Sequence, residues 1–181
     1  MNRINVVGIT GSGKTTFSRE LAEVLSIPYV QMDQLFWKRD WQEPSDEEFV
    51  PKIRDVVKSD AWVLDGNYHG RTCTIKWNRA DTVVWLDYGF FTTFLQLLKR
   101  SILRASTGEE LWPNTGNRES FRKAFFDKSS ILLWFLKYYK SNHVRYSSIM
   151  RSNEFPNVRF VRIGSRKEAK RFLELASKDL C

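Results

Sequence analysis

The residues with the clearest chemistry lie near the beginning of the chain, where an apolar run at residues 4–7 precedes Gly8-Ile9-Thr10-Gly11-Ser12-Gly13-Lys14-Thr15. This segment matches GxxxxGK[ST] in full, between a predicted strand and a predicted helix. Glycines let the backbone form a concave nest, whose N–H groups and those of the helix N-terminus point at an anion. Lys14 would reach the β- and γ-phosphates, and the Thr15 hydroxyl would bind Mg²⁺. The pattern predicts binding of a nucleoside triphosphate, with these contacting residues: Gly8, Gly11, Ser12, Gly13, Lys14, Thr15 and Thr16.

Three aspartates, Asp33, Asp65 and Asp87, each follow a predicted strand. In an open parallel sheet, ligands bind outside the carboxyl ends of the strands. Carboxylates gathered there could hold Mg²⁺, directly or through water, or accept a proton from an acceptor hydroxyl. For each aspartate alone, a turn or a helix cap is the alternative interpretation.

Four arginines, Arg100, Arg104, Arg118 and Arg122, bracket a glycine-containing segment at residues 106–120 that is typical of a mobile loop. Phosphoryl transfer requires positive groups around the moving phosphoryl. A lid or insert over about residues 100–125 could supply them and exclude water. A solvated cationic helix face is the alternative for each arginine.

The histidines and cysteines predict no metal site. His69 and His143 lie far apart, without a carboxylate spacing that indicates a metal pair or a triad, so we interpret them as surface histidines. Cys73 and Cys181 have no paired spacing for zinc and favour a reducing compartment.

Length and charge favour one domain with an anionic partner. The chain has 181 residues and a net charge of +8, from 29 Lys plus Arg against 21 Asp plus Glu. This charge suits a nucleotide or a nucleic-acid backbone, and the alternative is a solvated basic surface without a specific partner. Met1 leads straight into the first strand, and no apolar stretch is long enough to span a membrane. The expectation is a cytoplasmic protein.

Strands and helices alternate along the chain. A helix with an apolar stripe at Phe17, Leu21 and Leu25 follows the glycine-rich loop and ends before Pro28. Later helices are predicted from Ser45, with a kink or late start at Pro51, and over about 90–105, 122–150 and 167–177. The predicted strands after the first lie at 29–32, 61–64, 82–86 and 158–163. This order indicates an α/β three-layer fold with a parallel sheet and right-handed crossovers.

Three segments together resemble a known family. The glycine-rich loop, Met32-Asp33-Gln34-Leu35-Phe36-Trp37 and Trp62-Val63-Leu64-Asp65-Gly66-Asn67-Tyr68 are similar to the bacterial topology-modulation proteins, which belong to the adenylate-kinase-like P-loop kinases. The likeness covers residues 1 to about 105 and resumes in the last strand and helix. Residues 65–68 also resemble the Asp-Gly-Phe-Pro-Arg element of nucleoside monophosphate kinases, with Asn-Tyr in place of Phe-Pro and Arg71 as a substitute for the arginine.

The resemblance implies a single P-loop kinase-like domain over residues 1–181, with a five-stranded sheet of order 2-3-1-4-5. It implies that Lys14 and Thr15 hold phosphate and Mg²⁺, and that Asp65 holds metal-bound water. Arg166, in the loop after the last strand, would pack against adenine, and Arg118 and Arg122 would belong to the lid. The implied acceptor-side residues are Asp33, Trp37, Asn67, Tyr68 and Arg71.

Three functions fit this sequence. The first is an ATP-dependent kinase that moves the γ-phosphoryl of Mg-ATP to a small hydroxyl or phosphate acceptor. In that reaction Asp33 orients or deprotonates the acceptor, and Lys14 with Arg100 or Arg104 stabilises the transferred charge. The second is a nucleotide-dependent nucleic-acid-binding protein linked to DNA topology, although no helix-turn-helix, zinc finger or RNA-binding signature is present. The third is a degenerate NTPase that serves as a regulatory or scaffolding partner.

Overall fold

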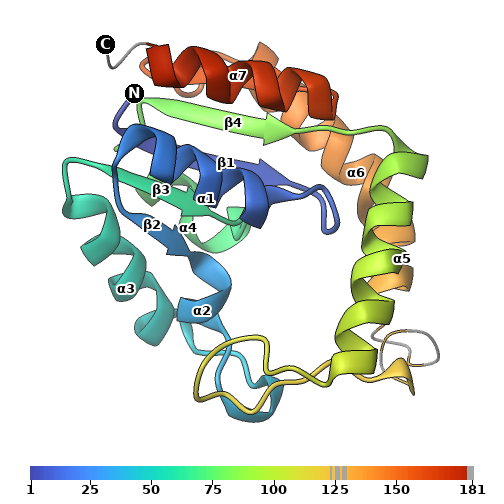
Figure 1. Ribbon diagram of the computed structural model, residues 1–181. Helices are drawn as coiled ribbons and strands as arrows, with labels where there is room; N and C mark the ends of the chain where they lie inside the picture. Colours follow the sequence, from blue (N-terminus) through green and yellow to red (C-terminus); the bar gives the residue numbers. More distant parts are fainter. Residues whose placement is uncertain (123, 125–126, 128–129, 179–181) are drawn as a thin grey trace.

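A five-stranded parallel sheet with the strand order β2-β3-β1-β4-β5 organises the protein (Figure 1). The computed structural model describes residues 1–122, 124, 127 and 130–178. The strands are β1 (Arg3–Gly8), β2 (Tyr29–Gln31), β3 (Trp62–Asp65), β4 (Thr82–Leu86) and β5 (Arg159–Ile163). The predicted fold class, strand order and parallel pairing are therefore confirmed.

The central strands are buried on both faces, which explains their continuous apolar sequence. Asn5 is the polar exception within β1 and is fully buried. Its Nδ2 donates to the Leu64 carbonyl at 2.8 Å, and its Oδ1 accepts from the Trp77 indole at 2.8 Å. Because these groups are paired, Asn5 adds polarity to the core without leaving an unsatisfied group.

Helices cover both faces of the sheet (Figure 1). On one face, α1 (Lys14–Leu25) packs with α7 (Arg166–Lys178) over β1, β3 and β4. On the other face lie α2 (Met32–Phe36), α3 (Asp46–Lys58), α4 (His69–Trp77) and α6 (Ile131–Arg151). Helix α5 (Phe90–Thr107) stands beyond the carboxyl ends of the strands, where it can contribute side chains to a site at that edge.

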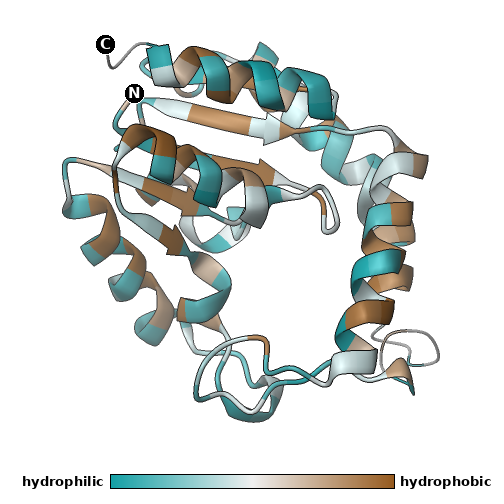
Figure 2. Cartoon of the chain, viewed as in Figure 1, coloured by the Kyte–Doolittle hydropathy of each residue, from teal (hydrophilic) through white to brown (hydrophobic). Residues whose placement is uncertain are grey.

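Figure 2 shows the hydropathy of each residue along the chain. Apolar and polar residues alternate along α1 and α7, as expected for helices with one buried face. Among the described residues, no helix combines the length and the apolar character needed to cross a membrane.

Two helices were not predicted from the sequence. Helix α2 begins at Met32, directly after the short β2, and a 3-10 turn follows at Arg39–Trp41. Helix α4 buries Thr72, Cys73, Lys76 and Trp77, so its buried face shows no apolar stripe.

The predicted helices differ from the structure mainly at their ends. Helix α3 begins at Asp46, capped by the Ser45–Glu48 capping box, and continues through Pro51, so the expected late start is wrong. The helix predicted over 122–150 appears as α6. Ser130 is its N-cap, and the Ser130 side chain accepts a hydrogen bond from the Leu132 N–H. Residues 123, 125–126 and 128–129 of that prediction lie outside the described residues.

The segment after α5, predicted as a loop, forms a short hairpin. Glu110 and Arg118 form an antiparallel bridge, and the Leu111 N–H donates to the Asn117 carbonyl at 2.9 Å. Two residues of the hairpin are buried: Trp112, with 7% of its surface exposed, and Asn117, with 1%.

A tryptophan latch, formed by Trp37, Trp41, Trp112 and Asn117, fastens this hairpin to the segment after α2. The rings of Trp37 and Trp112 stack at a centroid distance of 6.0 Å, and Trp41 meets both of them edge-on. Asn117 Nδ2 donates to the Lys38 carbonyl at 2.8 Å, and Asn117 Oδ1 accepts from the Trp41 N–H at 2.8 Å. The hairpin, residues 108–119, is therefore joined to α5 at one end and to the segment after α2 at the other, and we call it the strap (Figure 1).

We expect Asn117→Ala to loosen this strap, because it removes the two hydrogen bonds that join the hairpin to the backbone of Lys38 and Trp41. Limited proteolysis should cleave within residues 108–119 at least about tenfold faster than in the wild type. The exposed Glu109 provides a control, since Glu109→Ala leaves the latch intact. Equal cleavage rates for Asn117→Ala and the wild type would show that the latch does not hold the hairpin.

Candidate active site

The glycine-rich loop between β1 and α1 has the backbone conformation that its glycines predict. Gly11 has a φ of 80°, and a Cβ on it would lie 2.7 Å from the Cβ of Leu97. Gly13, the N-cap of α1, has a φ of 85°. Ser12 is buried, and its Oγ has no hydrogen-bond partner within the described part of the chain. The loop therefore packs closely against α5 and exposes its last glycine.

Lys14, Thr15 and Asp65 meet at the start of α1. Lys14 Nζ donates to the Ile9 carbonyl at 3.1 Å, and Thr15 Oγ1 donates to Asp65 Oδ2 at 2.7 Å. The Tyr29 hydroxyl donates to the same carboxylate oxygen at 3.2 Å. Asp65 is the last residue of β3, so the sheet itself places this carboxylate beside the loop.

Burial and charge oppose one another at this cluster. Burial raises the pKa of Asp65, while the charge of Lys14 and the hydrogen bond from Thr15 lower it. Burial lowers the pKa of Lys14, while Asp65 and Asp33 raise it. The lysine and the carboxylates therefore stabilise each other's charged forms in a site that water enters poorly.

Asp33 and Tyr68 form a second pair nearby. The Tyr68 hydroxyl donates to Asp33 Oδ1 at 2.6 Å. Burial and then the Asp33 charge raise the pKa of Tyr68, so the hydroxyl keeps its proton at neutral pH. Asp33 also raises the pKa values of Lys14 and Arg100, so its negative charge acts on the phosphate-binding groups.

Arg100 and Arg104 reach the same region from consecutive turns of α5. Arg100 Nη2 donates to Thr10 Oγ1 at 3.1 Å, which places the guanidinium over the glycine-rich loop. Arg104 Nη1 lies 3.1 Å from Glu119 Oε1. Burial, with the charge of Arg104, lowers the pKa of Arg100 to about 10, so Arg100 is still charged at neutral pH.

A cavity of about 740 Å³ connects these groups to α7. This volume lies within the range of ordinary ligand sites, about 300–1,000 Å³. Its lining includes the phosphate-binding loop, both α5 arginines, Tyr88 and residues of α7. The predicted residues that line it are Gly11, Gly13, Lys14, Thr15, Thr16, Arg100, Arg104 and Arg166.

Gln96 is a site residue that the sequence analysis missed. In the amide orientation that satisfies its neighbours, it donates to the Gly11 carbonyl at 2.7 Å and accepts from Arg166 Nε at 2.9 Å and Nη2 at 2.8 Å. It therefore links the glycine-rich loop to the loop after β5. The sequence feature that could have indicated this role is that Gln96 is a single polar residue within an apolar stretch of α5.

Asn67, predicted to bind the acceptor, contacts the glycine-rich loop in this structure. Its Oδ1 accepts from the Gly8 N–H at 2.9 Å, and its Nδ2 donates to the Gly8 carbonyl at 2.8 Å. Both functional groups of the amide are therefore used within the protein. We call this pair of hydrogen bonds the Asn67–Gly8 clamp.

Arg71, predicted to substitute for the kinase arginine, is held by the chain around the start of α3. It lies 3.4 Å from Glu43 and 3.2 Å from Asp46, and it donates to the Pro44 carbonyl at 3.3 Å. Its guanidinium also covers the Phe36 ring at 5.3 Å. These contacts connect α4 to the segment that follows α2.

The remaining candidates lie away from the cavity. Arg118 and Arg122 are exposed, and neither lines the cavity formed by the described residues. Asp87, at the end of β4, pairs with Arg162 at 2.6 Å and His143 at 3.0 Å, which links β4 to β5 and α6. Trp37 belongs to the tryptophan latch.

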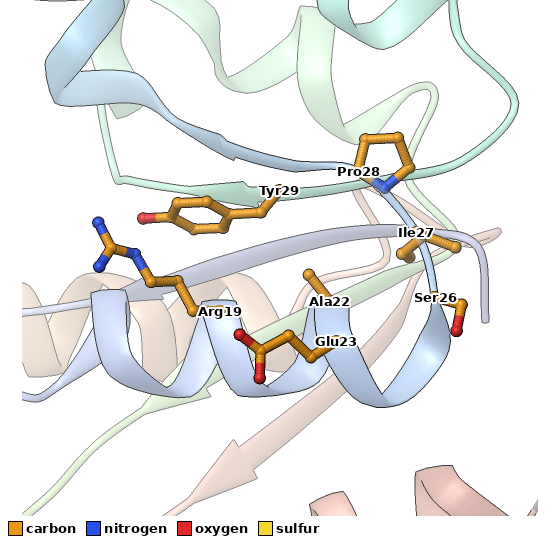
Figure 3. A pocket seen from close by; sticks show the side chains of 7 residues that line it. All are labelled: Arg19, Ala22, Glu23, Ser26, Ile27, Pro28 and Tyr29. Atoms are coloured by element: carbon orange, nitrogen blue, oxygen red, sulfur yellow. The ribbon is translucent and has the colours of Figure 1, made fainter.

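A second, more open hollow of about 500 Å³ lies where α1 meets β2 (Figure 3). Arg19 and Glu23 are the charged side chains that line it, and the Arg19 guanidinium lies 5.5 Å from the centre of the Tyr29 ring. The phosphate-binding residues do not line this hollow.

Comparison with known proteins supports the fold. No protein-family model matches the chain, and no curated protein matches it. Among solved structures, shikimate kinase from Bacteroides thetaiotaomicron is 15% identical with a TM-score of 0.55, covering 99% of this chain and 98% of that one. Shikimate kinase from Acinetobacter baumannii, solved with shikimate, is 16% identical with a TM-score of 0.57, covering 99% and 94%.

A gluconokinase from Sinorhizobium meliloti 1021 is 15% identical with a TM-score of 0.50, covering 99% of this chain and 95% of that one. At such identities the likeness concerns the arrangement of the backbone. Together with the glycine-rich loop and the strand order, it shows that this chain has the three-layer α/β fold of the P-loop kinases.

Proposed function

We propose that this protein is a kinase that transfers the γ-phosphoryl group of Mg-ATP to a small acceptor. The observation that carries the proposal is the shared cavity, which Lys14, Thr15, Arg100 and Arg104 all line, with Asp65 in contact with Thr15. Small-molecule kinases share this fold, which supports the same class of reaction here.

The residues beside the glycine-rich loop fit Mg²⁺. The Thr15 hydroxyl and the Asp65 carboxylate are oxygen donors, which this hard cation prefers. Within the described ranges, no cluster of three or more histidine, cysteine or acidic side chains could hold a metal by itself. That composition fits an ion held mainly by phosphate oxygens and water. When bound, Mg²⁺ would neutralise charge on the β- and γ-phosphates.

The cationic side chains would stabilise the transferred phosphoryl group. Lys14 enters from the loop, and Arg100 enters from α5 with its guanidinium already fixed on Thr10. Such charges act strongly in a water-poor site, and their fixed positions avoid the cost of reorganisation during the reaction. The latch supports this arrangement by tying the chain after α5 to the segment after α2.

The acceptor side favours a hydroxyl compound over a nucleoside monophosphate. The charge of Asp33 acts on Lys14 and Arg100, and its carboxylate would orient or deprotonate an acceptor hydroxyl. Tyr68 holds Asp33 Oδ1, which leaves Oδ2 for the acceptor. Arg71 is paired with Glu43 and Asp46, so its charge is already used within the protein.

Membership of the topology-modulation proteins belongs to this proposal as well. The supporting residues are the segments 32–37 and 62–68, which contain Asp33, Asp65 and Tyr68. We also propose that residues 1–181 act as one kinase-like domain, with the hairpin after α5 as its lid. Transfer from γ-labelled ATP, screened across nucleosides, nucleotides, sugars and small alcohols, tests the function and identifies the acceptor.

Lys14→Ala should abolish turnover in that assay. The loss should be at least about 10²-fold, because a fixed positive charge on the phosphates is removed. Lys99→Ala provides the control, since Lys99 is exposed on α5 and does not line the cavity. Substantial transfer by Lys14→Ala would rule out this mechanism.

Asp33→Asn should lower kcat by about 10²–10⁴-fold, because the amide can still accept from Tyr68 but cannot take a proton. The KM for ATP should change little, because Asp33 does not line the nucleotide cavity. The exposed Asp60 gives the matched control Asp60→Asn. An unchanged kcat would contradict the assigned role of Asp33.

Asp65→Asn should stabilise the protein without ligand and weaken its use of Mg-ATP. Burial raises the pKa of Asp65, so the folded protein keeps this proton to a higher pH than the unfolded chain does. Wild-type stability therefore falls as the pH rises from about 3.9 through the raised pKa. Asparagine removes that loss and should raise the free energy of unfolding at pH 7, measured by urea denaturation between pH 4 and 8.

Asp55→Asn is the control for Asp65→Asn, because Asp55 is exposed and its pair with Lys58 contributes little. If Asp65→Asn is no more stable than the wild type at pH 7, the buried carboxylate carries no stability cost.

A further inference from the structure

Lys76 is a fully buried lysine on α4 that the proposed reaction does not use. Its Nζ donates to the carbonyl oxygens of Asn67 and, at 3.3 Å, Gly66, and it lies 3.7 Å from Met32 Sδ. Within the described residues it forms no ion pair, and burial lowers its pKa to about 7. A buried ammonium group without an acidic partner is costly, and an apolar side chain would fill this place at lower cost.

The carbonyls that Lys76 binds belong to the turn between β3 and α4. This turn carries Asn67, whose amide clamps the backbone of Gly8, the first glycine of the phosphate-binding loop. The next residue, Tyr68, has a φ of 34° and donates to Asp33. One short turn therefore supports both the nucleotide side and the acceptor side of the site.

We propose that Lys76 is a positioning residue that fixes this turn, so that Asn67 holds the first glycine of the phosphate-binding loop. Its consequence for phosphoryl transfer rests on the proposed function, whereas the contacts of Lys76 with the turn and of Asn67 with Gly8 exist without ligand.

The hydrogen-bond partners of the turn explain why a donor is needed at position 76. The Gly66 carbonyl also accepts from Asn5 Nδ2 at 3.2 Å, so it keeps one partner without Lys76. For the Asn67 carbonyl, Lys76 is the donor that the structure shows. Removing the ammonium group leaves that carbonyl unpaired, which frees the turn to move away from the loop.

The variants Lys76→Met and Lys76→Gln distinguish the loss of the hydrogen-bond donor from a change in the volume of the side chain. Both are neutral, but only glutamine can donate to the Asn67 carbonyl. Lys52→Met is the matched control, because Lys52 Nζ also donates to a backbone carbonyl, that of Leu35 at 3.2 Å, but on the exposed surface.

Hydrogen exchange of the Gly8 amide in the protein without ligand is the direct measurement. We expect exchange about fivefold to tenfold faster in Lys76→Met, an intermediate rate in Lys76→Gln, and the wild-type rate in Lys52→Met. Urea denaturation should show that Lys76→Met is not less stable than the wild type. If Lys76→Met does not fold, the comparison of Lys76→Gln with the wild type decides. Wild-type protection of Gly8 in both Lys76 variants would overturn the proposal.

Calorimetry with Mg-ADP adds a test of how Lys76 acts. Lys76→Met and Asn67→Ala should each weaken binding by about tenfold, and the double variant should bind no more weakly than either single variant. Additive losses would overturn the proposal, because Lys76 would then act independently of Asn67. A wild-type protein that binds nucleotide but transfers no phosphoryl group would refute the kinase proposal alone.

Discussion

The candidate site depends on the Asn67–Gly8 clamp, which joins the loops that follow two neighbouring strands. Gly8 ends β1 and Asn67 follows β3, so the two hydrogen bonds extend the pairing of these strands beyond the sheet. The clamp keeps the glycine-rich loop next to Asp65, the last residue of β3. A parallel sheet gathers strand ends at one edge, and here a side-chain amide fixes the distance between two of them.

The other side of the site is closed by residues that are distant in sequence. Helix α5 carries Arg100 to Thr10, while Gln96 joins the loop to Arg166. The hairpin after α5 then returns to the segment after α2 through Trp112 and Asn117 (Figure 1). Because the strap is fastened at both ends, α5 is held beside the loop, and the pair of Arg104 with Glu119 at 3.1 Å adds an ionic contact between α5 and the strap.

Sequence predicted the parts of this protein that depend on local pattern. The glycine-rich loop has a fixed spacing, and the central strands are continuous apolar runs, so both were recognisable. The ion pairs of Arg71 could not be predicted, because Glu43 and Asp46 are distant from it in sequence and come close only after folding. Helix α4 was missed because Lys76 occupies a position where an apolar residue marks a buried face.

The buried charges separate site residues from structural ones. Lys14 lies among Asp65 and Asp33, so its charge is balanced by groups that the proposed chemistry also needs. Lys76 has only carbonyl dipoles, which stabilise an ammonium group but do not neutralise it. Net folding stability is only about 5–15 kcal/mol, so an uncompensated buried charge is a substantial cost. The contacts of Lys76 with the Gly66 and Asn67 carbonyls are consistent with the role proposed for it, which is to hold the turn that carries Asn67.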